Sequence, residues 1–340
     1  GSVYFDVLKY NEKYPYGELS GRILDDLIAG AGEERRTLDG QDEKRNSFDF
    51  ALWKKAKPEH IMRWDSPWSA GFPGWHIECS AMSAKYLGET FDIHGGGMDL
   101  LFPHHECEIA QSKGCNHTAP AKYWLHNNMI TINGQKMGKS LGNSISLGQL
   151  FTGDHALLNR GYSPMTVRFF ILQAHYRSTL DFSNEALDAS EKGLKRLLQA
   201  AELTTKLTAG KQSTVAIEEL KQRCFAAMND DFNSPILIAE LFEAASIAHK
   251  IHAGTEQLNT EDLASFQQLV HTCINDILGL KQETDSNAES MDGLVQIVIG
   301  MRNQAKQNKD YAASDAIRDQ LLAAGIQLKD SKEGTTWSKI

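Results

Sequence analysis

The stretch GWHIECSAMSAKYLGETFDIHGGGMDLLFPHHECEIA, residues 74–110, decides the fold of this 340-residue chain. Its pattern predicts a helix over Ser80–Leu87, a strand over Phe91–His94 and a second helix over His105–Ser112. Short helices and strands that alternate in this way predict an α/β domain, with functional residues on loops at the strand ends. We extend that prediction to residues 1–150.

Three residues of the same stretch could bind a metal ion. His104 and Glu108 are four residues apart, so on a helix they lie on one face, and Cys79 would reach them from a separate segment. A thiolate, an imidazole and a carboxylate suit zinc, although zinc prefers four ligands and we find three. The neighbours 105–107 would point away from that face. The alternative is that Cys79 is a buried core thiol and that His104 caps a helix or makes a hydrogen bond.

Two further motifs suggest a nucleotide. Lys136 and Lys139 belong to the run Lys-Met-Gly-Lys-Ser, which could fold over a triphosphate and neutralise charge on a departing pyrophosphate. The glycine run His94–Asp99 would bring backbone close to a ligand, with Asp99 accepting from a ribose hydroxyl. Taken singly, each motif is also typical of a solvated loop or a plain turn.

The composition is that of an ordinary globular protein, with 41% hydrophobic and 23% charged residues. No apolar stretch approaches the roughly 20 residues of a membrane span. Five cysteines, an odd number with wide spacing, favour a reducing, cytoplasmic setting over a disulfide framework. The net charge is −9, yet residues 301–340 hold seven Lys/Arg against five Asp/Glu. That tail could dock a polyanion or could be an ordinary solvated surface.

The second half of the chain has a helical pattern. Amphipathic segments over residues 184–207, 214–228, 236–252 and 260–278 predict a four-helix bundle at 184–280. The third helix has a start signal, with Ser234 as N-cap and Pro235 in the first helical position. Residues 281–290 are polar and predict a linker. Two helices and a pair of short strands then predict a small α+β domain at 291–340.

In their order, these motifs resemble the class I aminoacyl-tRNA synthetases and, more narrowly, the cysteinyl-tRNA synthetase family. The segments that carry the resemblance are Asp49–Lys54, Pro73–Cys79, His94–Asp99, Phe102–Glu108, Tyr123-Trp124, Lys136–Ser140, Met228–Pro235 and Gly334–Trp337. Gly138 departs from the family's usual Lys-Met-Ser-Lys-Ser, although both lysines remain. The family's His-x-Gly-His signature and a fourth zinc ligand, a cysteine, are not in the chain. We therefore expect the N-terminal half of the catalytic domain to be missing and residues 1–340 alone to be inactive.

The resemblance also implies a domain plan. Residues 1–150 would be the second half of a Rossmann-type catalytic domain with a remnant of its connective insertion. Residues 151–183 would be a stem-contact connector, 184–280 a tRNA-binding bundle, and 291–340 an anticodon-binding domain.

The activity implied by the resemblance is the ligation of cysteine to tRNA(Cys) in the cytoplasm, away from membranes and by a monomer. ATP with Mg²⁺ would convert cysteine to cysteinyl adenylate, and one Zn²⁺ per chain would select the substrate thiolate. The implied site residues are the metal ligands Cys79, His104 and Glu108, catalytic Lys136 and Lys139, ATP-binding Lys139, Gly97 and Asp99, substrate-binding Trp75 and His94, and tRNA-binding Lys306, Asp315, Arg318 and Trp337. Trp337 could stack on an unpaired base or could instead be a core aromatic.

Two alternative functions stay open. A related ligase that joins the same adenylate to an amino sugar would share the zinc and lysine motifs, but it should lack the tail at 291–340. The chain could also be a tRNA-binding fragment without catalysis. Cysteine-driven exchange between ATP and pyrophosphate separates these possibilities.

Overall fold

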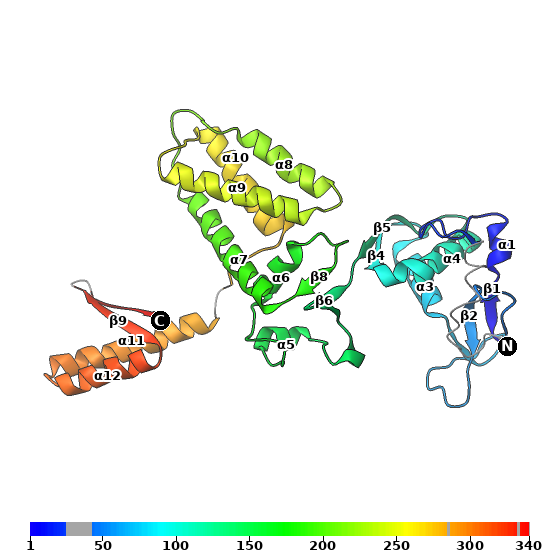
Figure 1. Cartoon of the computed structure of the whole chain (residues 1–340), viewed down its shortest axis with the longest axis horizontal. Coiled ribbons are helices and arrows are strands. Elements are labelled where there is room, and N and C mark those ends of the chain that lie inside the picture. Colours follow the sequence, from blue (N-terminus) through cyan, green and yellow to red (C-terminus); the bar gives the residue numbers. More distant parts are fainter. Residues whose placement is uncertain (25–42, 284–285, 332–333, 340) are drawn as a thin grey trace. The chain divides into compact units, whose positions relative to one another are not determined.

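The computed structural model describes residues 1–24, 43–283, 286–331 and 334–339 (Figure 1). It divides into two compact units, Gly1–Leu280 and Lys281–Ile340. In the described part of the chain, no helix combines the length and the apolar character that a membrane crossing needs.

The first unit begins with a three-stranded antiparallel sheet. Strands β1 (Val3–Phe5), β2 (Phe50–Lys55) and β3 (Gly71–Pro73) pair in the order β1-β2-β3. Helix α1 (Val7–Asn11) follows β1 and is capped by the carboxylate of Asp6. Buried side chains of this region pack against Cys107 and Ala110, which belong to the next subdomain. The sheet therefore braces the helix on which they lie.

A parallel β-α-β unit follows, as the α/β pattern predicted. Helix α3 (Trp75–Leu87) leads to strand β4 (Phe91–Gly97), and helix α4 (Glu106–Asn116) connects β4 to the parallel strand β5 (Ala121–Asn127). Figure 1 shows α3 and α4 packed side by side near these strands. Between β4 and α4 the chain makes a 3₁₀ turn and then an irregular turn at Leu101–His105. The predicted elements are confirmed, with longer bounds.

A second small sheet carries the lysine motif. Strand β6 (Ile130–Ile132) pairs antiparallel with β7 (Gln135–Lys136) and parallel with β8 (Leu180–Phe182). Two helices stand between β7 and β8, α5 (Leu147–Thr152) and α6 (Pro164–Leu172). Serine caps fix the start of both helices, since the side chains of Ser146 and Ser163 accept from backbone amides three residues on.

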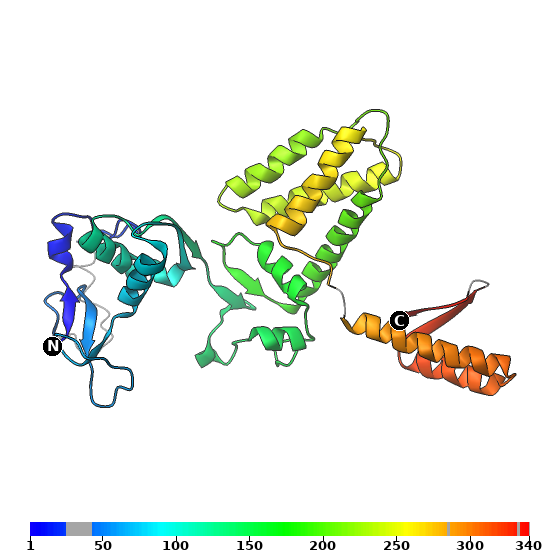
Figure 2. The same cartoon turned by 180° about the vertical axis from the view of Figure 1, so that it is seen from behind.

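Four long helices form the predicted bundle (Figures 1 and 2). They are α7 (Asn184–Thr205), α8 (Ile217–Asn229), α9 (Ser234–His252) and α10 (Thr260–His271), the last prolonged by a π-helical turn, Thr272–Ile277. Their apolar stripes meet in one continuous core. The helical period of the apolar residues therefore predicts the four helices of this bundle correctly.

One detail of the bundle corrects the prediction. The N-cap of α9 is Asn233, and Ser234 is already part of the helix. The hydroxyl of Ser234 donates instead to the carbonyl oxygen of Leu172, at 2.8 Å. The cap position shifted by one residue because this serine anchors the helix start to α6.

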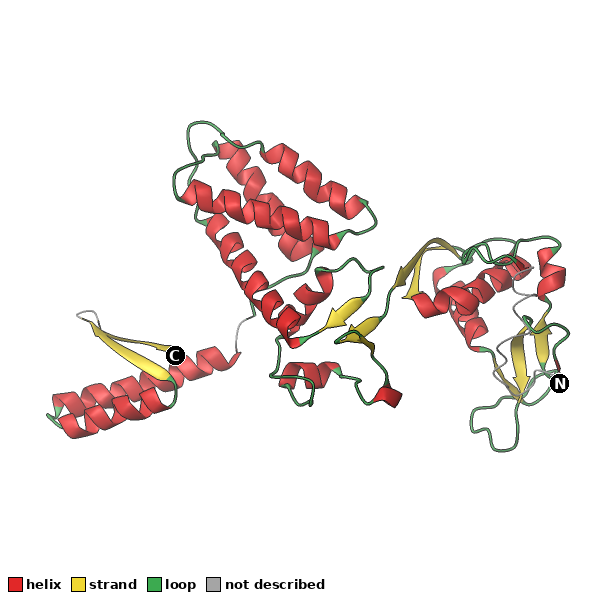
Figure 3. Cartoon of the chain, viewed as in Figure 1, coloured by secondary structure: helices red, strands yellow, loops and turns green. Residues whose placement is uncertain are grey.

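The second unit is a helical hairpin followed by a strand hairpin (Figure 3). It consists of α11 (Ser286–Gln307), α12 (Tyr311–Ala323), and the antiparallel strands β9 (Ile326–Ser331) and β10 (Gly334–Lys339). Helix α11 begins at Ser286, so the part of the predicted linker from residue 286 on is helical. Residues 281–283 have no regular structure, and 284–285 lie outside the described residues.

Candidate active site

The structure brings Cys79, His104 and Glu108 together. Cys79 lies on α3, His104 in the irregular turn before α4, and Glu108 in the first turn of α4. One potential ligand atom from each lies within 4.8 Å of the others, and His104 Nε2 is 3.1 Å from Glu108 Oε1. His104 and Glu108 are buried and Cys79 is half-buried. The three side chains thus form one S, N, O donor set.

The electrostatics of this trio favour a cation. Glu108 Oε1 is buried, and in the described structure it accepts no well-aligned hydrogen bond, although His104 Nε2 lies 3.1 Å away. Burial lowers the pKa of His104, so the imidazole next to it is neutral at pH 7. Burial, with the nearby Glu108 and Glu78, raises the pKa of the Cys79 thiol. A buried carboxylate oxygen without a well-formed hydrogen bond costs free energy. A divalent cation would offset that cost and favour the thiolate, so these residues fit zinc.

A second group of side chains adjoins the trio. His94 and His105 also place ring nitrogens within 4.8 Å of Glu108, and His94 Nε2 is 3.6 Å from Glu108 Oε1. His105 Nδ1 lies 2.8 Å from His126 Nε2 on β5. Burial, followed by the nearby imidazoles, lowers the pKa of His105 to about 3. The structure therefore holds a cluster of histidines beside Glu108, in which His105 is neutral at pH 7.

The place of His105 corrects the expectation for residues 105–107. Glu106 and Cys107 do point away, toward the amide of Ser20 and the hydroxyl of Tyr16 respectively. His105 instead faces the cluster, because α4 begins at Glu106 and the turn before it is irregular. Sequence reasoning also missed His126, which no spacing rule connects to His105.

Aromatic rings border the trio. The ring of Trp75 lies 4.4 Å from that of His104, and His94 lies 4.7 Å from Trp124. Trp75 is 62% exposed, so its indole is accessible to a ligand. The two residues expected to border the amino acid, Trp75 and His94, thus lie on the edge of the candidate metal site.

The glycine run after His94 is explained by close contacts. A Cβ atom at Gly96 would lie 2.7 Å from His105 Cε1, and one at Gly97 would collide with the carboxylate of Asp99. Gly97 ends β4, and Asp99 stands in the 3₁₀ turn that follows. Asp99 is therefore at the carboxyl end of a parallel strand, where α/β proteins commonly bind ligands.

The lysine loop is held by a residue that sequence reasoning passed over. Lys136 ends β7 and Lys139 starts a short 3₁₀ turn, and both are exposed. The side chain of Asn143 accepts from the amide of Gly138 at 2.9 Å and donates to the carbonyl of Lys136 at 3.1 Å. These two bonds fix the backbone between the lysines, whose exposed side chains could meet a phosphate.

The residues expected to contact tRNA lie in the second unit. Asp315 and Arg318 are exposed on α12, and Lys306 is on α11. Trp337 on β10 is half-buried and packs against the small core formed by Val295, Ile299 and Leu328. This packing corresponds to the core-aromatic alternative, so a stacking role for Trp337 stays a proposal.

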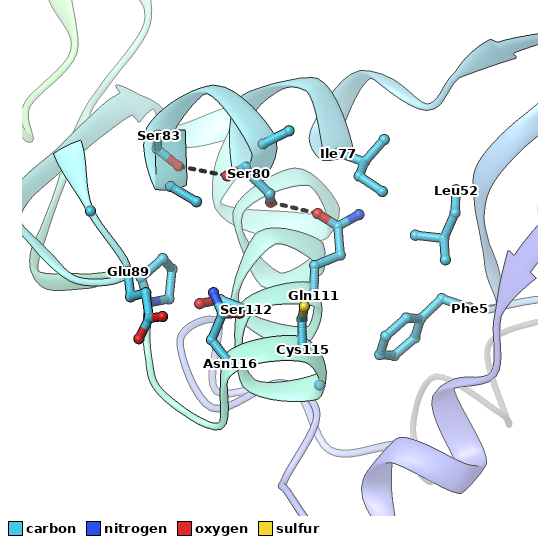
Figure 4. A pocket seen from close by; sticks show the side chains of 15 residues that line it. Phe5, Leu52, Ile77, Ser80, Ser83, Glu89, Gln111, Ser112, Cys115 and Asn116 are labelled. Carbon is cyan, nitrogen blue, oxygen red and sulfur yellow. Dashed lines mark hydrogen bonds between the residues drawn. The ribbon is translucent and has the colours of Figure 1, made fainter. Parts of the chain in front are cut away.

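A separate cavity of about 410 Å³ lies between α3, α4 and the first strands (Figure 4). Gln111 lines it, accepting from Ser80 Oγ at 2.5 Å and lying 2.6 Å from His76 Nδ1. None of the expected site residues lines this cavity. We therefore place the chemistry at the trio rather than here.

Comparison with known proteins identifies two families. Residues 1–192 match the tRNA synthetases class I (C) catalytic domain, and residues 225–282 match the DALR domain. The chain is 58% identical over 342 residues to the cysteine–tRNA ligase of Bacteroides thetaiotaomicron, covering 99% of this chain and 69% of that protein. It is 56% identical over 340 residues to the cysteine–tRNA ligase of Bacteroides fragilis, covering 99% of this chain and 68% of that protein.

Proposed function

We propose, because this chain belongs to the cysteine–tRNA ligase family of class I tRNA synthetases, that its trio, lysine loop and bundle serve cysteine, ATP and tRNA(Cys) respectively. The observation that carries the proposal is the convergence of Cys79 and His104 on the buried carboxylate of Glu108, beside the accessible ring of Trp75.

Cysteine would be recognised at the trio. Zn²⁺ held by Cys79, His104 and Glu108 would supply a soft Lewis acid for the substrate thiolate, which serine's hydroxyl matches poorly. Trp75 and His94 would enclose the small side chain. An apolar pocket alone discriminates one small group by only about 1–3 kcal/mol. Selection through sulfur can exceed that range, so recognition of cysteine does not depend on a tight fit.

Adenylate formation would involve the glycine run and the lysine loop. The cysteine carboxylate attacks the α-phosphorus of ATP, the bond to the bridging oxygen breaks, and pyrophosphate leaves with that electron pair as its Mg²⁺ complex. Asp99, beside Gly97, would accept from a ribose hydroxyl. Lys136 and Lys139 would stabilise the charge that develops on pyrophosphate. Asn143 would keep the loop between the lysines in shape.

Transfer to tRNA would rely on the bundle and the second unit. Helices α7 and α9 form a groove of about 490 Å³ lined by Arg196, Gln199, Phe242 and His249, among others. The guanidinium of Arg196 lies over the ring of Phe242, 5.9 Å from its centroid. A cation beside an aromatic ring suits an RNA backbone and its bases. Lys306, Asp315, Arg318 and Trp337 would meet the tRNA elsewhere, in the anticodon region.

The setting we infer is the cytoplasm. All five cysteines are free, as expected of a protein that works under reducing conditions. We also infer that the enzyme acts as a monomer.

The test is cysteine-dependent exchange of ³²P-pyrophosphate into ATP, measured on the natural protein that carries this chain. We expect exchange with cysteine but not serine, charging of tRNA(Cys), and one zinc per chain by metal analysis. Cys79→Ser should lose the zinc and lower the rate of exchange by at least about 100-fold. Substitution of residues that only support a metal ligand already lowers metal affinity or activity by about 10–100-fold. Cys115→Ser, at an exposed cysteine, is the matched control.

The other outcomes are informative. Exchange without tRNA charging would favour the amino-sugar ligase, and no exchange at all would leave a tRNA-binding protein. Full activity of Cys79→Ser with its zinc retained would refute the metal site.

A further inference from the structure

The turn between α8 and α9 is unusual in its backbone. Asp231 and Phe232 both adopt left-handed conformations, with φ of 54° and 55°. Consecutive left-handed residues other than glycine are uncommon and are held only where the surroundings fix them. The turn lies within the Met228–Pro235 motif, to which the proposed chemistry gives no role.

The side chain of Asp231 explains what holds this turn. Its Oδ1 accepts from the Tyr176 hydroxyl at 2.6 Å, and its Oδ2 pairs with Arg177 Nε at 2.7 Å. Its carbonyl oxygen lies 3.1 Å from His175 Nε2. The hydrogen bond from Tyr176, with help from Arg177, lowers the pKa of Asp231, so the carboxylate is charged at neutral pH. Three consecutive residues between α6 and β8 thus converge on one aspartate.

The same three-residue segment holds Asn128. The backbone amide of Asn128 donates to the carbonyl of Tyr176 at 2.9 Å, and its side-chain amide donates to the carbonyl of Arg177, also at 2.9 Å. Asn128 lies in the short connection between strands β5 and β6. Strand β5 before it carries His126, which bonds to His105, and strand β6 after it leads into the lysine loop.

We propose that Asp231 is a positioning residue, which clasps the segment His175–Arg177 so that Asn128 keeps the cysteine site and the lysine loop in a productive arrangement. This inference deepens the proposed function and rests on it. The cysteine site with its glycine run and the lysine loop must reach the same ATP molecule. The first would meet the ribose and the α-phosphate, and the second the pyrophosphate. A loose joint at Asn128 would let them drift apart without harming either motif by itself.

The contacts of Asp231 with His175, Tyr176 and Arg177, called the clasp below, should have a moderate effect on activity. Arg177 is 58% exposed, and an ion pair in that setting contributes little by itself. The Tyr176 hydroxyl donates to a charged acceptor, which makes the stronger bond. We therefore expect about a tenfold loss on removal of the charge, rather than the abolition expected of a residue that touches substrate.

The test compares Asp231→Asn with Asp230→Asn in the natural protein that carries this chain. Asparagine tolerates the left-handed backbone, so Asp231→Asn removes the charge and keeps the turn. Asp230 is the exposed neighbour, so its variant makes the same charge change outside the clasp. Asp231→Asn should lower kcat for exchange, or raise the KM for ATP, by about tenfold, with the KM for cysteine and the zinc content unchanged. Asp230→Asn should match the wild type.

A double-mutant cycle tests the partner. Tyr176→Phe should reproduce most of the loss, and the pair Asp231→Asn with Tyr176→Phe should be no worse than Asp231→Asn alone, because both variants weaken the hydrogen bond from Tyr176 to the charged carboxylate. Additive losses, or an equal loss in Asp230→Asn, would overturn the clasp.

Amide hydrogen exchange separates this inference from the proposed function, because it needs no catalysis. The Asn128 amide should exchange faster in Asp231→Asn than in Asp230→Asn. That result supports the clasp even if the wild type shows no exchange of pyrophosphate, in which case only the proposed function fails. Unchanged protection of Asn128 would overturn the clasp whatever the activity.

Discussion

Helices α9 and α3 show two uses of a helix in this protein. α9 buries eight of its 19 residues, seven of them in the bundle core, among them Leu237 and Leu241. α3 has 13 residues and buries none of them, and its Tyr86 is 74% exposed. α9 is therefore positioned by apolar packing, whereas α3 presents Trp75 and Cys79 to a site. Damage to the bundle should appear as lost stability, and damage around α3 as lost chemistry.

The largest effect is expected in the bundle core. Leu237 is 0% exposed, so Leu237→Ala should lower the free energy of unfolding by about 3 kcal/mol through lost burial and a residual cavity. Ile236→Ala, at a neighbour that is 50% exposed, is the control and should cost far less. Chemical denaturation gives both values. The contrast between the two regions weakens if Leu237→Ala also lowers kcat for pyrophosphate exchange under conditions where the protein stays folded.

The next effect belongs to the lysine loop. Lys139→Ala should lower kcat for exchange by about 100-fold, because a lost donor to transition-state charge typically costs that much, and it should leave the unfolding midpoint unchanged. Lys122→Ala is the control, at another exposed lysine, paired with Asp92 on the neighbouring strand. Equal rates for the two variants would show that Lys139 does not meet the pyrophosphate.

The success of the predictions from sequence also differs between the bundle helices and the candidate site. The bundle helices were predicted within a few residues, because burial of one face imposes a 3.6-residue period on the sequence. The meeting of His104 and Glu108 was predicted from their spacing, and Cys79 from its chemistry. The roles of His105 and Asn143 were not predicted. One depends on an irregular turn and a partner on another strand, and the other on side-chain bonds to backbone. Neither leaves a periodic signal.

The glycine run offers a smaller and more local test. Gly96→Ala should push the His105 ring away from its place beside His94 and, if the proposed metal site depends on that ring, lower kcat/KM for cysteine by about tenfold. Gly95→Ala is the matched control and should have little effect, since a Cβ atom there would lie 3.6 Å from the Leu125 carbonyl oxygen, an ordinary van der Waals contact. Steady-state exchange kinetics of both variants decide the matter. If Gly95→Ala loses as much as Gly96→Ala, general strain in β4 is the cause and not the contact with His105.

The last effect is a dependence of stability on pH, which is absent at neutral pH and appears only in acid. Burial, with a contribution from His104, lowers the pKa of His76 to about 4, against 6.5 in an unfolded chain. Between those pH values His76 is protonated in the unfolded state but not in the folded state. The free energy of unfolding should therefore fall as the pH drops from 6.5 toward 4. His76→Gln should flatten this part of the profile of unfolding midpoint against pH. His252→Gln, at an exposed histidine of α9, should keep the wild-type slope. Since this test concerns slopes, any overall loss from either substitution does not obscure it. If the two variants give parallel profiles, the proton is taken up elsewhere, and His76 has no part in the acid sensitivity of this region.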